Sequence, residues 1–281
     1  MFHLYLRAEV FDKWRVIKVG KYILLTLLLV MSYLPAYGSS IIVARNDNEI
    51  IIGADSKRVR ASTEDLSDAR AELICKIVRA DNIFITSTGI VGIVSYNQRG
   101  GIPPEFDLTE VMKKASLSEG SIMDKADTLA KSLSGALLSI SEWVKKKMPA
   151  LFKQMSIGKQ LLQVVMAGLE NGTPTFIVMA FEPSISPSGE MKINVEFHPC
   201  PGIACPSNFV YIFMGKHEAI DRYLPQDPDM WKNNPVDVVR KLIEIEVTSE
   251  HETVGPPIDI LRITKEGSEW IQKKDMCADL N

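Results

Sequence analysis

The sequence predicts an α+β domain in which antiparallel sheets are covered by helices. Two observations lead to this prediction. Apolar, β-branched segments and amphipathic helical segments follow one another in the order strands, helices, strands, helices, strands. Turn residues join several neighbouring strand segments directly, and strands joined by a tight turn run antiparallel. Layers of sheet and helix bury the apolar face of each such segment.

The strongest hairpin signal lies near the start of this pattern. Ser40–Arg45 and Ile50–Asp55 are rich in β-branched residues, and a turn rich in Asn and Asp separates them. The polar stretch Ser56–Glu72 has no apolar periodicity, so we expect a loop there. A second hairpin is expected, with strands at Leu73–Arg79 and Ile83–Thr88 and with Gly89 at its end.

The middle of the chain is expected to be helical. Ser121–Lys147 has apolar residues at three- and four-residue spacings, and Pro149 follows its end. A shorter helix is expected at Phe106–Lys114. The remaining expected strands are Leu161–Gly168, Pro174–Phe181, Met191–Phe197, Phe209–Met214, Ile258–Thr264 and Glu269–Gln272, and the remaining helices are Lys216–Tyr223 and Pro235–Thr248.

Residues 1–38 have the composition of a signal peptide. A basic segment up to Lys21 precedes an apolar run of about 13 residues, short of the roughly 20 that a membrane-spanning helix needs. Small residues at Ala36 and Gly38 suit a signal peptidase. We therefore expect cleavage after Gly38, export to the periplasm or beyond, membrane contact only during export, and a single domain of residues 39–281. An uncleaved membrane anchor and a buried core helix are the alternatives.

After that cleavage the chain is acidic. The full chain has 32 basic and 35 acidic residues, and residues 1–38 contain five of the basic and two of the acidic ones. Residues 39–281 therefore have 27 basic and 33 acidic residues, a formal net charge of −6. With no Lys/Arg cluster beyond Lys145–Lys147, a role in nucleic-acid binding is disfavoured. No Ser/His/Asp elbow and no His-Glu-x-x-His motif is present, and we expect neither a cofactor nor a metal ion.

All four cysteines lie in residues 39–281. An exported protein meets an oxidising compartment in which disulfides persist. Cys200 and Cys205 bracket a proline-rich loop that a short disulfide could staple, and the spacing lacks the second Cys/His pair of a zinc site. Cys75 and Cys277 are either a second bridge or free thiols.

Cleavage after Gly38 would leave Ser39 with both a nucleophilic hydroxyl and a free α-amine. Such an amine has an unperturbed pKa of roughly 7.7–8.0 and can accept the hydroxyl proton near neutral pH. Asp55 lies sixteen residues further on, where the first hairpin returns to the start of its first strand. Lys76, expected among apolar residues of the next strand, needs a buried partner that Asp55 can supply. Gly89, without a side chain, can bring its backbone N–H close to a developing oxyanion.

Several motifs, in this order, resemble a known family. Ser39-Ser-Ile-Ile-Val-Ala, Gly53-Ala-Asp-Ser-Lys57, Cys75-Lys-Ile77 and Thr86-Ser-Thr-Gly89 resemble the opening of proteasome β-type subunits and their bacterial peptidase relatives, with the same sixteen-residue separation of the first two. Later segments similar to motifs of this family are Met166–Pro174 and Thr253–Ile260, so the resemblance spans about Ser39 to Trp270.

The resemblance implies a four-layer αββα sandwich of the N-terminal nucleophile hydrolase class, made of two antiparallel sheets flanked by helices. It implies Ser39 as nucleophile and N-terminal base, Asp55 and Lys76 as the activating pair, and Gly89 as oxyanion donor. The substrate would be an amide, most simply a peptide, and ring assembly in the family leaves a homo-oligomer open. The family usually begins with Thr where this chain has Ser.

Further departures from the family pattern concern the later residues. Val164 and Val165 stand where many peptidase members carry a Ser, and Asp221 is only a stand-in for the Asp of a later Asp-x-x-Ser pair. The sequence therefore leaves three functions open: an exported peptidase, an acylase of small amides using the same site, and a non-catalytic binding or assembly module like the α-type subunits of proteasomes.

Overall fold

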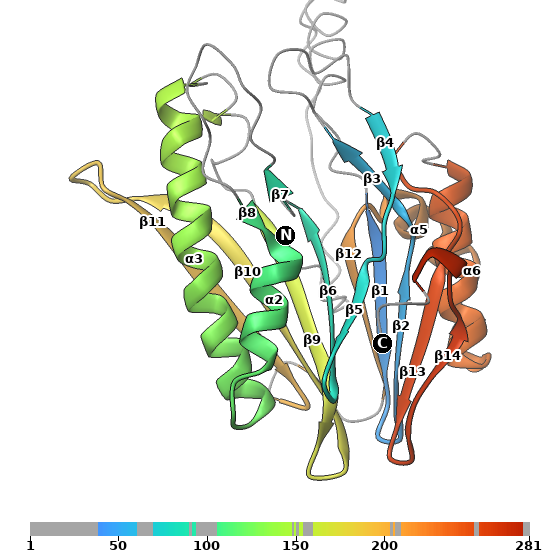
Figure 1. The fold of residues 1–281 in the computed structure, drawn as a ribbon. Coiled ribbons are helices and arrows are strands. Elements are labelled where there is room, and N and C mark those ends of the chain that lie inside the picture. Colours follow the sequence, from blue (N-terminus) through green and yellow to red (C-terminus); the bar gives the residue numbers. More distant parts are fainter. Residues whose placement is uncertain are drawn as a thin grey trace, which may run out of the picture. The chain divides into compact units, whose positions relative to one another are not determined.

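Two five-stranded antiparallel sheets form the centre of the fold (Figure 1). One has the strand order β12-β1-β2-β13-β14 and the other the order β11-β10-β9-β6-β5. The structure, a computed structural model, describes residues 39–60, 70–89, 92–93, 106–147, 149, 152–153, 160–202, 205, 209–249 and 253–277 of the 281. The expected signal peptide, residues 1–38, lies outside the described residues.

The strands have the following bounds. The first sheet contains β1 Ser40–Arg45, β2 Glu49–Ala54, β12 Val210–Gly215, β13 Asp259–Thr264 and β14 Gly267–Gln272. The second contains β5 Ile77–Ala80, β6 Ile83–Gly89, β9 Leu162–Glu170, β10 Thr173–Ile185 and β11 Met191–Cys200. Two short pairs join β3 Lys57–Arg60 to β4 Arg70–Leu73 and β7 Gly92–Ile93 to β8 Phe106–Asp107.

Four α-helices are present in the described part of the chain. They are α2 Leu108–Ser116, α3 Ile122–Lys147, α5 Glu218–Tyr223 and α6 Pro235–Ser249. Ser121 begins α3 with reciprocal side-chain and backbone hydrogen bonds to Asp124, a capping box that satisfies N–H groups of the first turn. Short 3₁₀ turns lie at Leu224–Gln226, Met230–Lys232 and Asp275–Cys277.

Strand alternation divides the buried side chains into three cores and so defines four layers. Ile41 and Val43 of β1 pack between the two sheets against Phe84 and Val165 of the second sheet. Ile42 and Ala44, on the other face of β1, pack against α6, together with Ile220 of α5. The second sheet is covered on its outer face by α2 and α3. The order is therefore helices, sheet, sheet, helices.

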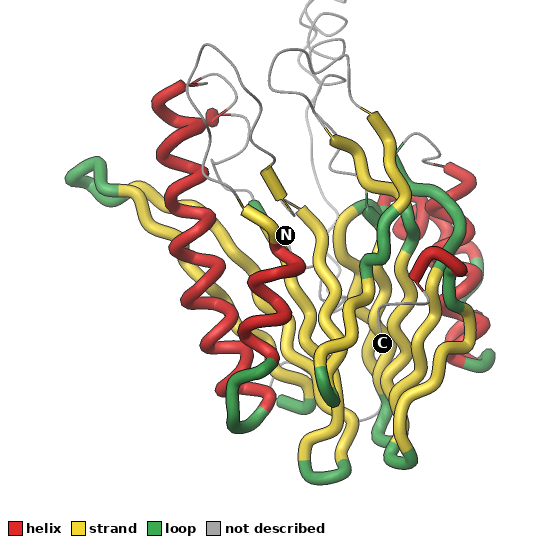
Figure 2. Tube along the Cα trace, in the orientation of Figure 1, coloured by secondary structure: helices red, strands yellow, loops and turns green. Residues whose placement is uncertain are grey.

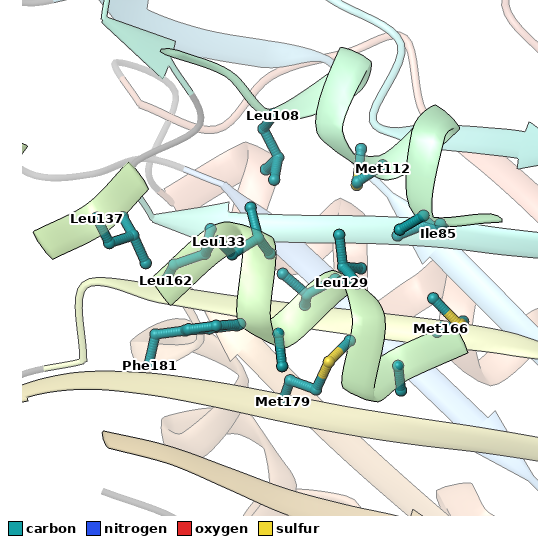
Figure 3. Close-up of a cluster of buried hydrophobic side chains, with 14 of the residues drawn as sticks. Ile85, Leu108, Met112, Leu129, Leu133, Leu137, Leu162, Met166, Met179 and Phe181 are labelled. Carbon is teal, nitrogen blue, oxygen red and sulfur yellow. The ribbon is translucent and has the colours of Figure 1, made fainter. Parts of the chain in front are cut away.

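Figure 3 shows the core between α2, α3 and the second sheet. Leu129, Leu133 and Leu137 recur on one face of α3 and are fully buried against this sheet. The opposing side chains are Ile85, Leu162, Met166, Met179 and Phe181. The three- and four-residue spacing that predicts this helix is therefore also what aligns its leucines with the sheet.

The tight turns of the hairpins gather at one end of the sheets (Figure 2). These turns join β1 to β2, β5 to β6, β9 to β10 and β13 to β14. Because each hairpin starts and finishes at the end opposite its turn, the start of β1 and the ends of β2 and β6 meet at the other end of the sheets. Three of the four candidate site residues lie at those positions.

The predicted elements agree with the structure, with three corrections. The helix expected at Phe106–Lys114 begins at Leu108, because Phe106 and Asp107 form β8. Ser56–Glu72 is not a loop throughout, because β3 and β4 lie at its two ends and pair with each other; residues 61–69 are outside the described part. The strand expected over Leu73–Arg79 is interrupted at residues 74–76, so Lys76 precedes β5 rather than lying within a strand. Composition alone could not locate this break, because Ile74 and Cys75 are as apolar as strand residues.

Both pairs of cysteines form disulfides. Cys200–Cys205 closes the loop after β11, as the sequence predicts, and Cys75–Cys277 settles the alternative that the sequence leaves open. The second bridge joins residues 202 positions apart and ties the segment before β5 to the 3₁₀ turn at the end of the described chain. Within the described residues, no helix has both the length and the apolar character needed to span a membrane.

Candidate active site

Ser39 lies at the start of β1, between two strands that fix its position. Its carbonyl oxygen accepts a hydrogen bond of 2.7 Å from the Lys216 N–H, which extends the β1–β12 ladder by one step. The next residue, Ser40, accepts a hydrogen bond of 3.2 Å from the Asp55 N–H on the β2 side. Strand alternation places the Ser39 side chain on the face that Ile41 and Val43 turn toward the second sheet. Ser39 itself is partly buried.

Asp55 follows β2, and its carboxylate is completely buried. Oδ1 accepts a 2.9 Å hydrogen bond from the Ser40 N–H and the ammonium of Lys76. Oδ2 accepts hydrogen bonds from the N–H groups of Lys57 at 2.9 Å and Gly255 at 3.1 Å. Four donors therefore meet one carboxylate, which is how a buried charge is compensated. The Ser40 bond places this carboxylate next to the peptide unit of Ser39.

Lys76 forms an ion pair with Asp55, as the sequence predicts. Its side chain is 2% exposed and that of Asp55 is 0% exposed, so the pair is removed from water. A buried lysine is costly unless its charge is paired, and this pairing fixes the ammonium at the carboxylate oxygen that also binds the Ser40 amide. Lys76 lies in the interruption at residues 74–76, directly before β5, so its side chain is not bound to the alternation of a regular strand.

Gly215, at the end of β12, brings β6 close to Ser39. A Cβ on this glycine would collide with the Ser39 carbonyl oxygen and would lie 2.7 Å from Thr88 Oγ1. Gly215 also has a φ of +75°, which residues with a side chain rarely adopt. Thr88 of β6 is therefore adjacent to the start of β1, and Gly89 follows it directly. The sequence does not predict Gly215 as a site residue, because its only signal is its position before the helical segment expected from Lys216.

Gly89 ends β6 with a φ of +110°. A side chain there would collide with the Leu161 carbonyl oxygen and lie 2.9 Å from Leu162 Cα, so the backbone of β9 requires a glycine at this position. This close packing requires a glycine at position 89 whether or not its N–H also serves as an oxyanion donor.

No family model matches the chain, and no curated protein is detectably similar to it. The four residues therefore have to be judged on their geometry. Ser39, Asp55 and Lys76 are joined through the Asp55 carboxylate, and Gly89 reaches the same end of the sheets through Thr88. Asp221 does not join them by any described contact: its carboxylate lies 2.9 Å from Nδ1 of His217, one turn earlier. In the described residues, no cluster of His, Cys, Asp and Glu suits a metal ion.

This arrangement can support nucleophilic chemistry at Ser39. An ammonium held in a buried ion pair supplies a fixed positive charge, and such a charge stabilises an alkoxide or oxyanion more strongly than it would in water. Thr86 and Thr88 lie on the face of β6 that also carries Phe84, which packs between the sheets. Polar side chains of β6 thus share the inter-sheet space with Ser39, in contrast to the apolar contacts deeper between the sheets.

We expect Gly215→Ala to lower both the thermal stability and any activity that depends on Ser39. Gly172 offers a matched control, because it has the same φ of +75° but no atom within 4 Å of an added Cβ. Gly172→Ala should cost roughly 1 kcal/mol for its backbone conformation. Gly215→Ala should cost about 1–3 kcal/mol more, because the methyl group must displace the Ser39 carbonyl. Equal losses in thermal denaturation would show that Gly215 does not hold Ser39 in place.

Proposed function

We propose that residues 39–281 form an exported amide hydrolase of the N-terminal nucleophile class, most simply a peptidase, with Ser39 as its nucleophile. The observation that carries this proposal is the Asp55 carboxylate, which binds the Lys76 ammonium and the Ser40 N–H on one oxygen. Both side chains of this pair are buried, as are those of the Lys274–Asp259 pair, whereas surface pairs such as Lys192–Glu190 have side chains that are more than half exposed. The resemblance of the motifs around Ser39, Asp55, Lys76 and Gly89 to proteasome β-type subunits supports the same assignment.

The proposed reaction needs no group beyond these residues and water. Ser39 Oγ attacks the amide carbonyl carbon while the Ser39 α-amine accepts the hydroxyl proton. The Lys76 ammonium favours the ionised oxygen, and the Gly89 N–H donates to the oxyanion of the tetrahedral intermediate. Collapse breaks the C–N bond, the departing amine takes the proton from the α-ammonium, and an ester on Ser39 remains. Water then hydrolyses the ester by the same steps and regenerates the hydroxyl.

The order of layers supports the fold that this class requires. An N-terminal nucleophile hydrolase has two facing antiparallel sheets with helices outside, and the described residues form layers in this order. The two disulfides support export, because such bonds persist in oxidising compartments. Neither observation is specific to an enzyme, so the proposal depends on the site.

The N-terminus of the mature protein tests the proposal directly. We expect intact-mass and N-terminal peptide analysis of the protein purified from its native compartment to place the first residue at Ser39. A mature chain beginning at Ser40, at Ile41 or upstream of Ser39 would lack the α-amine on the nucleophile and would rule out the mechanism. A full-length chain in the membrane fraction would instead favour the uncleaved anchor.

An acyl-enzyme trap separates the catalytic from the non-catalytic interpretation. A peptidyl β-lactone should acylate the mature protein once, and tandem mass spectrometry should place the added mass on Ser39. Comparison of fluorogenic peptides with small acylated amines would then distinguish a peptidase from an acylase. Absence of labelling on a chain that does begin at Ser39 would favour a binding or assembly module.

A further inference from the structure

A second buried lysine, Lys274, contacts the backbone next to the Asp55–Lys76 pair. Its side chain is 0% exposed, and its Nζ lies 2.8 Å from Oδ2 of Asp259, which is 1% exposed. The same Nζ donates to the carbonyl oxygens of Ile74 at 3.2 Å and Asp55 at 3.4 Å. The three N–H groups of the ammonium thus have three acceptors, one on each of three separate segments.

Two of these acceptors belong to the backbone of the candidate site. The Asp55 carbonyl is part of the residue whose carboxylate binds Lys76, and Ile74 lies two residues before Lys76. The Ile74 N–H in turn donates to the Ser56 carbonyl at 2.9 Å. The segment 74–76 is thus connected in two ways to the residues that follow β2. The Ile74 N–H bonds Ser56 directly, and the Lys274 ammonium bridges the carbonyl oxygens of Ile74 and Asp55.

Covalent and local contacts hold Lys274 itself in place. Its backbone N–H donates to Oδ1 of Asp259 at 2.9 Å, and its carbonyl accepts from the Cys277 N–H at 2.9 Å. Cys277 is bonded to Cys75, the residue directly before Lys76. The segment 274–277 is therefore bonded to the segment 74–76 at two points. The Lys274 ammonium donates to the Ile74 carbonyl, and Cys277 forms a disulfide with Cys75.

We propose that Lys274 is a positioning residue for the candidate site, whose ammonium holds the backbones of Asp55 and Ile74 so that the Asp55–Lys76 pair stays aligned beside Ser39. Its catalytic consequence rests on the proposed function, whereas the positioning itself does not. Burial lowers the pKa of Lys274 below its ordinary value, and the nearby Asp259 and Asp55 offset part of this effect by favouring the charged form. An ordinary core residue would need no such arrangement of three polar acceptors.

The test replaces the buried pair without leaving a lone charge. Lys274→Met alone would strand the Asp259 carboxylate, so the informative variant is Lys274→Met with Asp259→Leu, because apolar replacement of both partners of a buried pair is often tolerated. Lys273→Met is the matched control, since Lys273 neighbours Lys274 but its Nζ lies over the Trp270 ring instead. Global stability is measured by denaturant unfolding of each variant.

Amide hydrogen exchange measures, independently of activity, how firmly the hydrogen bonds to the Asp55 carboxylate are held. In the double variant we expect exchange to accelerate at least tenfold at the Ser40, Lys57 and Gly255 amides that Asp55 binds, relative to the Lys273→Met control and with β9 and β10 unchanged. In parallel, kcat on an amide substrate should fall about 10- to 100-fold with KM little changed, because small displacements of a catalytic group act mainly on the chemical step. Unchanged exchange at these three amides would overturn the proposal.

Two further outcomes remain informative. If the wild-type protein hydrolyses no amide, the proposed function fails while the exchange measurement still decides whether Lys274 positions Asp55. If the double variant does not fold, Lys274→Gln with Asp259→Asn supplies the same measurements, since this pair removes the ammonium while the two neutral amides can still hydrogen-bond each other. Unaltered exchange and turnover in that variant would then reject the positioning role.

Discussion

Ser39→Ala is expected to abolish turnover and acyl-enzyme formation while leaving the fold intact. Removal of the nucleophile leaves only binding and oxyanion stabilisation, so the loss should be at least about 1000-fold in kcat. The fold should persist because the contact that fixes this residue is its carbonyl bond to Lys216, which alanine keeps. Ser39→Thr should retain activity, since threonine supplies the same hydroxyl beside the same α-amine.

Ser40→Ala is the matched control for this experiment. Ser40 is 1% exposed and its Oγ has no hydrogen-bond partner in the described part of the chain. Its side chain lies on the β1 face that packs against α6, opposite to the face of Ser39. Loss of the hydroxyl should therefore leave kcat within about twofold and change the stability by no more than about 1 kcal/mol. Equal activity of Ser39→Ala and Ser40→Ala on a fluorogenic peptide would remove Ser39 from the mechanism.

The layers and most elements of this fold follow from local sequence patterns. The spacing of Leu129, Leu133 and Leu137 predicts α3, and the continuous apolar run in β1 predicts a strand that is buried on both faces. The Asn171-Gly172 turn is equally local, because both residues adopt positive φ values that few others tolerate. Such signals need no knowledge of distant contacts.

The site could be predicted only where its partners are close in sequence or follow hairpin geometry. Asp55 is returned to Ser39 by one hairpin, and an isolated lysine among apolar residues requires an acid, which leads to Lys76. Gly255, Lys274 and Cys277 lie about 200 residues from the residues they contact near Asp55. No local pattern encodes such contacts, so the second lysine and the Cys75–Cys277 bridge become visible only in the folded chain.

The most destabilising single change that we expect in the site is Asp55→Ala. It would leave the Lys76 ammonium buried without its carboxylate, which typically costs about 3–5 kcal/mol. It would also leave the N–H groups of Ser40, Lys57 and Gly255 without their acceptor. Denaturant unfolding at neutral pH should show this loss, and Lys192→Met in the exposed Lys192–Glu190 pair should cost less than about 1 kcal/mol as a control.

Lys76→Met should be less damaging to the fold than Asp55→Ala, and the difference tests how the pair is held. After Lys76→Met the carboxylate still accepts three backbone N–H groups, whereas after Asp55→Ala both the ammonium and those three donors lose their acceptor. Each buried donor left unsatisfied costs about 1–3 kcal/mol, so the two variants should differ by at least about 1 kcal/mol. Both should lose activity, because Lys76→Met removes the ammonium and Asp55→Ala removes the carboxylate that holds it in place. If Lys76→Met proved the more destabilising variant, the backbone donors would not be what holds the Asp55 carboxylate. The charge of Lys76 would then be structural first, and its catalytic role would have to be argued from the pH profile of Lys76→Arg, which keeps the charge and moves its position.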